Sequence, residues 1–238
     1  MIRPVCAAVL LVALAPRQAA PPDLLGPTRA AYAALKSYAD TGTVTREFGQ
    51  PRAMGSEKHT FRTFFRAPRD FFFEFAKNPS ISKERIVVWG DAAAFHTWWS
   101  TTQSSETYPP GTGASAFTTM AFPTLGSDLQ VASLVLPQGA LPGTLAEMVE
   151  ARDAGTDTIG GHRCRKLVGT AQSVYRATGH ISNVRQVTVW IDADTQLVRQ
   201  ILEDASDPAS ISRTTTTFDP RANPALDDGV FRFTPPAK

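Results

Sequence analysis

The residue types that most often do chemistry in proteins are scattered along this sequence. Its four histidines are His59, His96, His162 and His180. No two of them are four positions apart, the spacing that places two metal ligands on one helix face. None has a cysteine partner at the spacing of a zinc site. We therefore expect neither a metal site nor histidine-based catalysis.

The sequence has two cysteines, Cys6 and Cys164. Cys6 lies in an apolar N-terminal run that we expect to be removed on export, so the mature chain would have no internal disulfide. Arg163 and Arg165 flank Cys164 and could lower the pKa of its thiol if both were near it. On an alternating strand, however, both arginines face away from Cys164, which favours a buried structural cysteine.

Two short motifs imitate enzyme signatures without their context. Residues 192–195 resemble the start of phosphoryl-transfer aspartate enzymes, but Gln196 stands where that motif needs Thr or Val. The glycine-rich residues 111–116 imitate a dinucleotide loop, but Pro109 and Pro110 stand where its strand would be. We therefore expect that this protein is not an enzyme and binds no cofactor. An enzyme, which would need a cleft with converging Asp, His or Ser side chains, is a third alternative beside the two functional hypotheses given below.

The composition is that of a folded globular protein. Of the 238 residues, 42% are hydrophobic and 19% are charged, which excludes wholesale disorder. The formal net charge is +2, and it falls to zero without residues 1–20, which contain Arg3 and Arg17 and no acidic residue. A nucleic-acid-binding protein normally carries a clustered basic excess. We therefore expect no nucleic-acid partner.

The first twenty residues have the layout of a secretory signal peptide. A basic start with Arg3 precedes an apolar run over residues 5–15, and the small residues Ala19 and Ala20 follow it. The apolar run is too short to span a membrane, which takes about 20 residues. We predict a cleaved signal peptide over residues 1–20 and a periplasmic protein. A buried N-terminal helix is the alternative.

The periodicity of the remaining chain favours an α+β fold. Helical spacing appears from Leu24 to Tyr38 and again over residues 117–125 and 129–136, whereas residues 101–113 have the composition of a loop. The predicted strands are 38–48, 58–66, 70–76, 85–89, 94–99, 148–159, 164–171, 185–192, 197–203 and 212–218. No β-α-β alternation appears, so the sheet should be antiparallel. We expect one domain over residues 21–238, with a curved antiparallel sheet of about ten strands, an N-terminal helix and a mid-chain helical lid on the concave face.

Aromatic residues concentrate in one part of the predicted sheet. Seven of the 14 phenylalanines fall between positions 61 and 75. Alternation places many of them on one sheet face. They are either an aromatic core or the wall of a cleft that the helices leave partly open to an apolar ligand. The predicted cleft residues are Phe61, Phe65, Phe71, Phe73, Phe75, Phe95 and Trp99. The predicted lid residues are Phe117, Met120, Phe122 and Leu125.

The order of several motifs is similar to that of a known family. These motifs are residues 64–73, the hairpin from Ile86 to Trp99, residues 187–203 and the ending 231–236. Together they resemble the periplasmic lipoprotein carrier (LolA-like) superfamily over about residues 28–236. The segment 161–167 looks more like that superfamily's exported members of unknown function.

This resemblance implies an unclosed antiparallel β-barrel whose concave apolar face is lidded by helices and takes acyl chains. Phe71 and Phe73 fall on positions that line that face in the carriers. The carriers have an arginine immediately before the proline and use it to hold the lid. Here that position is Ala67, and Arg66 stands one residue earlier.

Two functional hypotheses follow. The first is a monomeric exported module that binds a lipid or an acylated protein in the aromatic cleft, in the manner of the lipoprotein carriers. The second is an envelope sensor or scaffold whose cleft is filled by its own helices and whose partner is an envelope membrane protein. Fold alone does not choose between them.

Overall fold

The computed structural model describes residues 23–90, 93–109, 112–121, 123–136, 145, 148–175 and 180–237. The predicted signal peptide therefore lies outside the described residues. Within them the helices are α1 (Gly26–Ala33), α2 (Gly113–Met120), α3 (Ser127–Val135) and the 3-10 helix η1 (Asp228–Phe231). The strands are β1 (Ser37–Gln50), β2 (Ala53–Arg66), β3 (Asp70–Ala76), β4 (Arg85–Gly90), β5 (Phe95–Trp99), β6 (Ser104–Tyr108), β7 (Met148–Ile159), β8 (His162–Tyr175), β9 (His180–Asp192), β10 (Val198–Asp204), β11 (Ile211–Phe218) and β12 (Arg221–Ala222).

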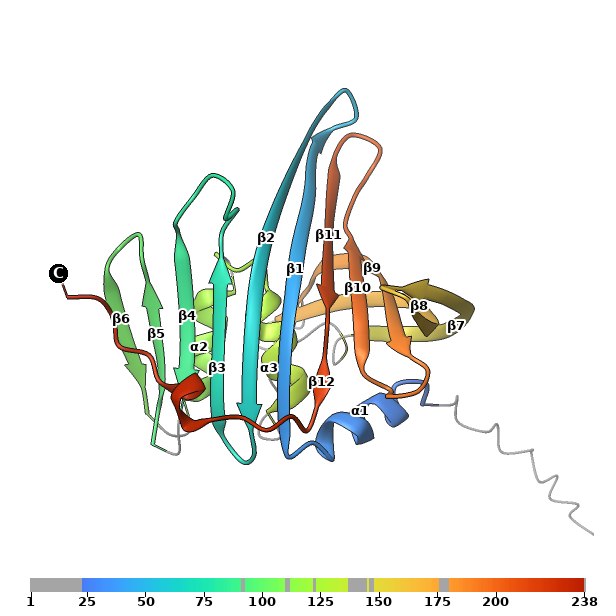
Figure 1. Cartoon of the computed structure of the whole chain (residues 1–238). Helices are drawn as coiled ribbons and strands as arrows, with labels where there is room; N and C mark the ends of the chain where they lie inside the picture. The colour runs from blue at the N-terminus through green and yellow to red at the C-terminus, as the bar shows by residue number, and fades with distance from the viewer. Residues whose placement is uncertain are drawn as a thin grey trace, which may run out of the picture.

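The twelve strands of the described chain form one antiparallel sheet in the order β6-β5-β4-β3-β2-β1-β11-β10-β9-β8-β7, with the short β12 beside β1 (Figure 1). Most neighbours are consecutive in sequence because hairpins join them. The exception is the pair β1 and β11, which brings the two halves of the chain together. Strands β6 and β7 are the two ends of this order, so the sheet is unclosed, as the sequence predicts.

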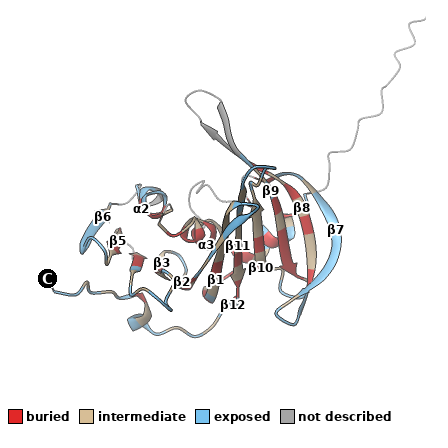
Figure 2. Ribbon diagram, turned by 90° about the horizontal axis from the view of Figure 1, so that it is seen from above, coloured by how far each residue is buried: buried red, intermediate tan, exposed pale blue. Residues whose placement is uncertain are grey.

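The sheet curves around the mid-chain helices. Seen from above, it bends around α3, and buried residues gather on α3 and on the strands near it (Figure 2). Alternation explains why this concave face is apolar. Phe71, Phe73 and Phe75 point into the main core cluster with the helices, whereas Phe72 belongs to a second cluster on the other face.

The three α-helices of the described chain have eight or nine residues each. Helices this short are not stable alone in water, so packing must hold them. The buried side chains of α2 and α3 join the core cluster of the concave face through residues such as Phe117 and Val131. Helix α1 has a proline in its first turn, where the missing N–H costs no hydrogen bond. It lies beside the lower end of β1 and below β10 (Figure 1).

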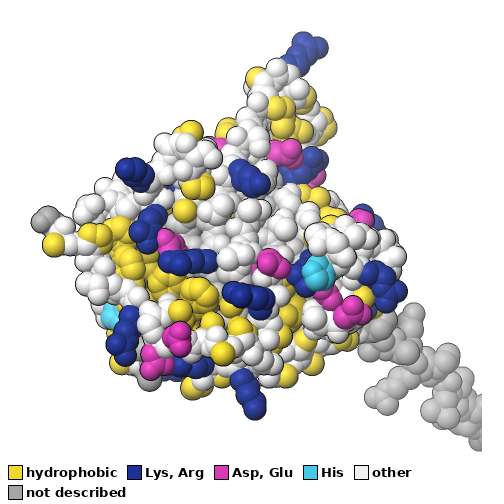
Figure 3. Space-filling model, viewed as in Figure 1, with side chains coloured by type: hydrophobic (Ala, Val, Ile, Leu, Met, Phe, Trp, Pro, Cys, Tyr) yellow, Lys and Arg dark blue, Asp and Glu magenta, His cyan; other side chains and the backbone are white. Residues whose placement is uncertain are grey.

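The C-terminal segment covers part of the opposite, convex face. After β12 the chain crosses this face and contributes Phe231 and Phe233 to a cluster with Phe72, Trp89 and Trp98. Figure 3 shows hydrophobic side chains gathered on this face, bordered by Lys and Arg. The segment thus shields aromatic side chains that alternation directs away from the main core.

Two local expectations differ from the structure. Residues 101–113 contain the strand β6, which pairs with β5 at the sheet edge. Most residues of β6 are exposed, so this strand has no hydrophobic alternation by which the sequence could reveal it. In addition, the helical pattern over residues 117–125 breaks after Met120, and Leu125 and Gly126 adopt positive φ angles of 55° and 77°. No helix in the described part of the chain is long and apolar enough to cross a membrane.

Candidate functional site

The seven predicted cleft residues lie together on the concave face. We call them the aromatic wall: Phe61, Phe65, Phe71, Phe73, Phe75, Phe95 and Trp99. All are buried except Trp99, which is partly buried and packs against the same cluster. The Trp99 Nε1–H donates to Glu84 Oε1 at 2.9 Å, so its polar atom is satisfied. The sequence therefore located these side chains on a common surface.

Strand register is what brings the wall together. In the β2–β3 hairpin, Phe61 pairs with Phe75 and Phe65 pairs with Phe71. Phe61 and Phe73 stack with ring centroids 5.7 Å apart and an interplanar angle of 26°. Aromatic cross-strand contacts of this kind stabilise the sheet as well as the core.

Helix α2 covers part of the aromatic wall. The Phe117 ring meets Phe71 edge-on, with centroids 5.3 Å apart, and meets Phe95 at 5.2 Å. Phe117 is 1% exposed, so it fills the space between the two strands it contacts. In this region the wall forms a packed interior.

The remaining lid residues have different positions. Met120 is buried in the core cluster, and Leu125 is partly buried against it. Phe122 lies outside the described residues. Direct ligand contact by the wall and lid residues stays a prediction.

An apolar pocket remains beside the wall, where α1, α3 and the turn between β2 and β3 meet. It has a volume of about 390 Å³. We call it the α1 pocket, and most of its lining is apolar: Leu25, Tyr32, Ala33, Leu35, Phe65, Ala67, Pro68, Leu134, Val135, Leu136 and Leu145. Its volume falls within the range of about 300–1,000 Å³ that is typical of small-molecule sites.

One polar atom of the α1 pocket has no partner. Thr28 lines the pocket and is 1% exposed, and its hydroxyl makes no hydrogen bond among the described residues. A buried hydroxyl without a partner costs about 1–3 kcal/mol. A ligand oxygen or nitrogen at this position would remove that cost.

Polar contacts hold α1 against the sheet. The backbone N–H of Val198 donates to the Tyr32 hydroxyl oxygen at 3.2 Å. Burial raises the pKa of the Tyr32 hydroxyl, which stays neutral at pH 7. The Arg165 guanidinium donates to the carbonyl oxygen of Leu24, just before the helix. These contacts fix the position of α1, which forms one side of the α1 pocket.

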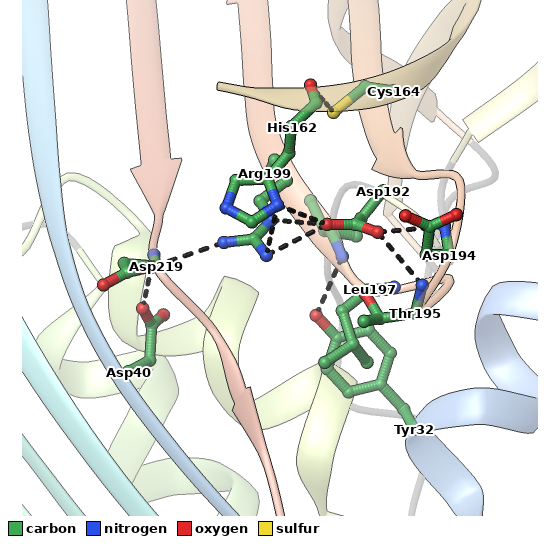
Figure 4. A network of polar contacts seen from close by, with 11 residues as sticks. Tyr32, Asp40, His162, Cys164, Asp192, Asp194, Thr195, Leu197, Arg199 and Asp219 are labelled. Atoms are coloured by element: carbon green, nitrogen blue, oxygen red, sulfur yellow. Dashed lines mark hydrogen bonds and ion pairs between the residues drawn. The ribbon is translucent and has the colours of Figure 1, made fainter. Parts of the chain in front are cut away.

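A charged network lies at the ends of β9, β10 and β11, next to α1 (Figure 4). Arg199 Nη2 is 2.9 Å from Asp192 Oδ2, and Arg199 Nη1 is 3.3 Å from Asp219 Oδ1. His162 Nδ1 is 3.2 Å from the same Asp192 oxygen. The backbone N–H of Asp219 donates to Asp40 Oδ1 at 2.8 Å. These contacts tie five neighbouring strands together, from β8 through β9, β10 and the end of β11 to β1.

The enzyme-like features of the sequence have structural roles in this network. Asp192 Oδ1 accepts the backbone N–H groups of Asp194 and Thr195, both at 3.0 Å, so residues 192–195 form the predicted turn. Cys164 is fully buried, and burial raises the pKa of its thiol. Among the described residues, no group of three or more His, Cys, Asp and Glu side chains could hold a metal ion.

Sequence reasoning found the wall but not most of the α1 pocket. Phe65 is the only predicted cleft residue that lines it. Leu25, Tyr32 and Leu35 carry the helical periodicity of the first helix, which predicted burial but not a hollow beside it. These side chains lie next to α3 and Pro68 because distant segments of the chain pack together, and no local sequence pattern predicts that packing.

Comparison with known families adds the following. Residues 118–238 match a family model described as "Predicted periplasmic protein (DUF2092)". The chain belongs to this family. Membership agrees with the predicted export, so the periplasmic location expected from the sequence is confirmed at the level of the family. No curated protein sequence matches this DUF2092 protein.

Several solved structures are similar to this DUF2092 protein. The lipoprotein LppX from Mycobacterium tuberculosis is 14% identical, with 84% of this chain and 93% of that chain covered and a TM-score of 0.45. LprF from Mycobacterium bovis is 14% identical, with 82% and 89% covered and a TM-score of 0.41. A LolA superfamily protein from Nitrosomonas europaea is 9% identical, with 88% and 96% covered and a TM-score of 0.35.

Proposed function

We propose that this protein binds an acyl chain, as part of a lipid or an acylated protein, in the α1 pocket. The observation that carries the proposal is an apolar hollow of about 390 Å³ that the helices in the described part of the chain leave unfilled. Burying one CH₂ group contributes about 0.8 kcal/mol, so a chain of several CH₂ groups provides the affinity. No chemical step is part of this function.

The polar atoms of the pocket support an amphiphilic ligand over a pure hydrocarbon. The unpartnered Thr28 hydroxyl offers one hydrogen bond to an ester or carboxyl oxygen. Arg29 also lines the pocket and forms an exposed ion pair with Asp23 at 2.5 Å. A ligand with an apolar chain and an oxygen-bearing end matches both features.

The test uses a substitution at the rim of the pocket. Ala33 is exposed and lines the pocket, so Ala33→Trp should fill it without disturbing the core. We expect this variant to bind dodecanoic acid at least tenfold more weakly in calorimetry. The matched control is Ala30→Trp, because Ala30 is exposed on the same helix but does not line the pocket. Equal binding by both variants, or no binding by the unmodified protein, would refute the proposal.

A second candidate function is the sensor or scaffold with a self-filled cleft. The observation that favours it is Phe117, which packs against Phe71 and Phe95 and occupies the wall. Under this function Phe73→Ala would destabilise the fold without changing lipid binding. Native mass spectrometry of the protein purified from its periplasm separates the two, because co-purified lipid supports the first candidate and its absence supports the second.

A further inference from the structure

A second pocket opens at the other end of the concave face, and its chemistry differs from that of the α1 pocket. It lies between the β1–β2 hairpin, β11 and the connection from α2 to α3, and it has a volume of about 490 Å³. We call it the polar pocket. Its polar lining consists of Arg46, Glu57, His59, Lys77, Ser212 and Thr214. Trp99 and Leu125 supply an apolar side.

His59 presents a buried donor in this pocket. Its side chain is 2% exposed and packs against the Phe75 ring, with centroids 5.2 Å apart. The backbone N–H of Asn78 donates to His59 Nδ1 at 2.9 Å, so in the neutral ring the hydrogen is on Nε2. Burial lowers the pKa of His59, which favours this neutral form.

The donor at His59 Nε2 has no hydrogen-bond partner in the described part of the chain. Glu57 Oε2 lies 3.4 Å from His59 Nε2, a contact that is an ion pair only when the ring is protonated, and it does not satisfy this donor as a hydrogen bond. Buried donors in folded proteins are nearly always paired. An unpaired donor in the wall of a pocket therefore indicates an acceptor on a bound ligand.

The charges of the polar pocket favour an anion. Arg46 forms no ion pair within the described ranges, and its guanidinium lies 5.3 Å from the Phe48 ring centroid. Lys77 Nζ is 3.5 Å from Glu84 Oε2, and the Lys77 side chain is 45% exposed. Glu57 is the single carboxylate among the lining residues, so the two cations exceed it by one charge.

We infer that the polar pocket binds a phosphate or phosphoester group. Arg46 and Lys77 would supply the charge, His59 Nε2–H a directed hydrogen bond, and the Ser212 and Thr214 hydroxyls two further donors. Charge-assisted hydrogen bonds to a phosphate are about twice as strong as neutral ones. Leu125 and the Trp99 ring, on the apolar side, would contact the first atoms of an attached chain. This site does not rest on the proposed function, because it shares no lining residue with the α1 pocket.

The experiment compares three probes on the full mature chain by calorimetry at constant ionic strength. They are inorganic phosphate, dihexanoyl phosphatidic acid below its micelle concentration, and dihexanoyl glycerol, which lacks the phosphate. Binding of phosphatidic acid alone identifies a lipid headgroup, and equal binding of inorganic phosphate identifies the free ion as sufficient. Both results support the site. If neither phosphate compound binds, or if dihexanoyl glycerol binds as well as phosphatidic acid, the inference is wrong.

Two variants assign the binding to the pocket. Arg46→Gln removes a cation from the lining and should weaken phosphate-compound binding at least tenfold. Lys58→Gln is the matched control, because Lys58 is the exposed neighbour of His59 on β2 and does not line the pocket. If both substitutions weakened the binding of the phosphate compounds equally, the attraction would come from the general surface charge, and the assignment to the polar pocket would be wrong. Ala33→Trp, which fills the α1 pocket, should leave phosphate binding unchanged.

Discussion

Two of the buried carboxyl groups in the described part of the chain, those of Asp40 and Asp128, have raised pKa values. Tyr38 donates its hydroxyl hydrogen to Asp40 Oδ2 at 3.1 Å, and Thr124 donates to Asp128 Oδ1 at 2.6 Å. Burial raises the pKa of each carboxyl from 3.8 to about 7. For Asp40 the neighbouring Asp219 raises the pKa further, whereas Arg199 lowers it. Both groups therefore titrate close to neutral pH.

The first prediction is that stability falls as the pH rises from about 4 to about 7. In that window the folded protein keeps a proton on Asp40 that the unfolded chain has released, so the protonated group stabilises the fold at low pH. Each carboxyl contributes a slope of about 1 kcal/mol per pH unit. Urea denaturation at several pH values measures it. Asp40→Asn should flatten the curve, and an unchanged slope in this variant would contradict the assignment.

The second prediction concerns the close approach of Phe61 to Gly42. Gly42 on β1 pairs with Phe61 on β2, and a Cβ at Gly42 would collide with the Phe61 ring. Gly42→Val should push this ring out of place and lower the free energy of unfolding by about 1–3 kcal/mol. Thr43→Val, one residue on and facing the convex side, should change it by less than about 0.5 kcal/mol. Urea denaturation measures the free energy of unfolding of both variants. Equal losses of stability in the two variants would argue against the packing explanation.

At the scale of elements, α2 is held by its contacts rather than by its own sequence. It has eight residues and no side-chain cap at its N-terminus. Its main anchor is Phe117, which contacts Phe71 on β3 and Phe95 on β5. The attachment of α2 to the aromatic wall therefore depends mainly on one ring.

The third prediction is that Phe117→Ala loosens α2 and uncovers the wall. Removing a buried Phe side chain costs about 3–5 kcal/mol. We expect faster amide hydrogen exchange in α2 and stronger fluorescence of a bound apolar dye. Ser115→Ala, on the exposed side of the same helix, is the control and should leave both signals unchanged. If α2 exchanged no faster in Phe117→Ala, other contacts would have to hold the helix.

At the scale of the whole molecule, the two faces of the sheet are covered in different ways. Helices cover the concave face, and the C-terminal segment covers part of the convex face (Figures 1 and 3). Phe233 lies 5.1 Å from Trp89 and 5.3 Å from Trp98, measured between ring centroids. Arg66 also lies over the Phe231 ring at 4.9 Å. The end of the chain thus completes the second hydrophobic cluster.

The fourth prediction is that Phe233→Ala exposes Trp89 and Trp98 to water. Tryptophan emission should shift to longer wavelength, and the free energy of unfolding should fall by about 1 kcal/mol because Phe233 is only half buried. Thr234→Ala, the exposed next residue, should show neither effect. An unshifted emission spectrum in the Phe233 variant would mean that the segment does not shield these rings in solution.

The sequence by itself determined the sheet and the face on which its aromatic residues lie. Alternation in residues 58–66 and 70–76 is a local property, because successive side chains of a strand point to opposite faces whatever the rest of the chain does. All ten predicted strands are therefore present, and all seven wall residues share one cluster. Edge strand β6 was missed, because an exposed strand shows no hydrophobic alternation.

Only the tertiary structure decided which parts of the concave face are filled. Phe117 lies more than twenty residues along the chain from Phe71 and Phe95, the wall rings that it contacts, and whether a ring fills a space depends on the volumes of all its neighbours. The same holds for the α1 pocket, which α1, α3 and Pro68 enclose from distant parts of the chain. It also holds for His59, since an unpaired donor is defined by what surrounds it. Periodicity records the direction of a side chain, whereas a cavity is set by long-range packing.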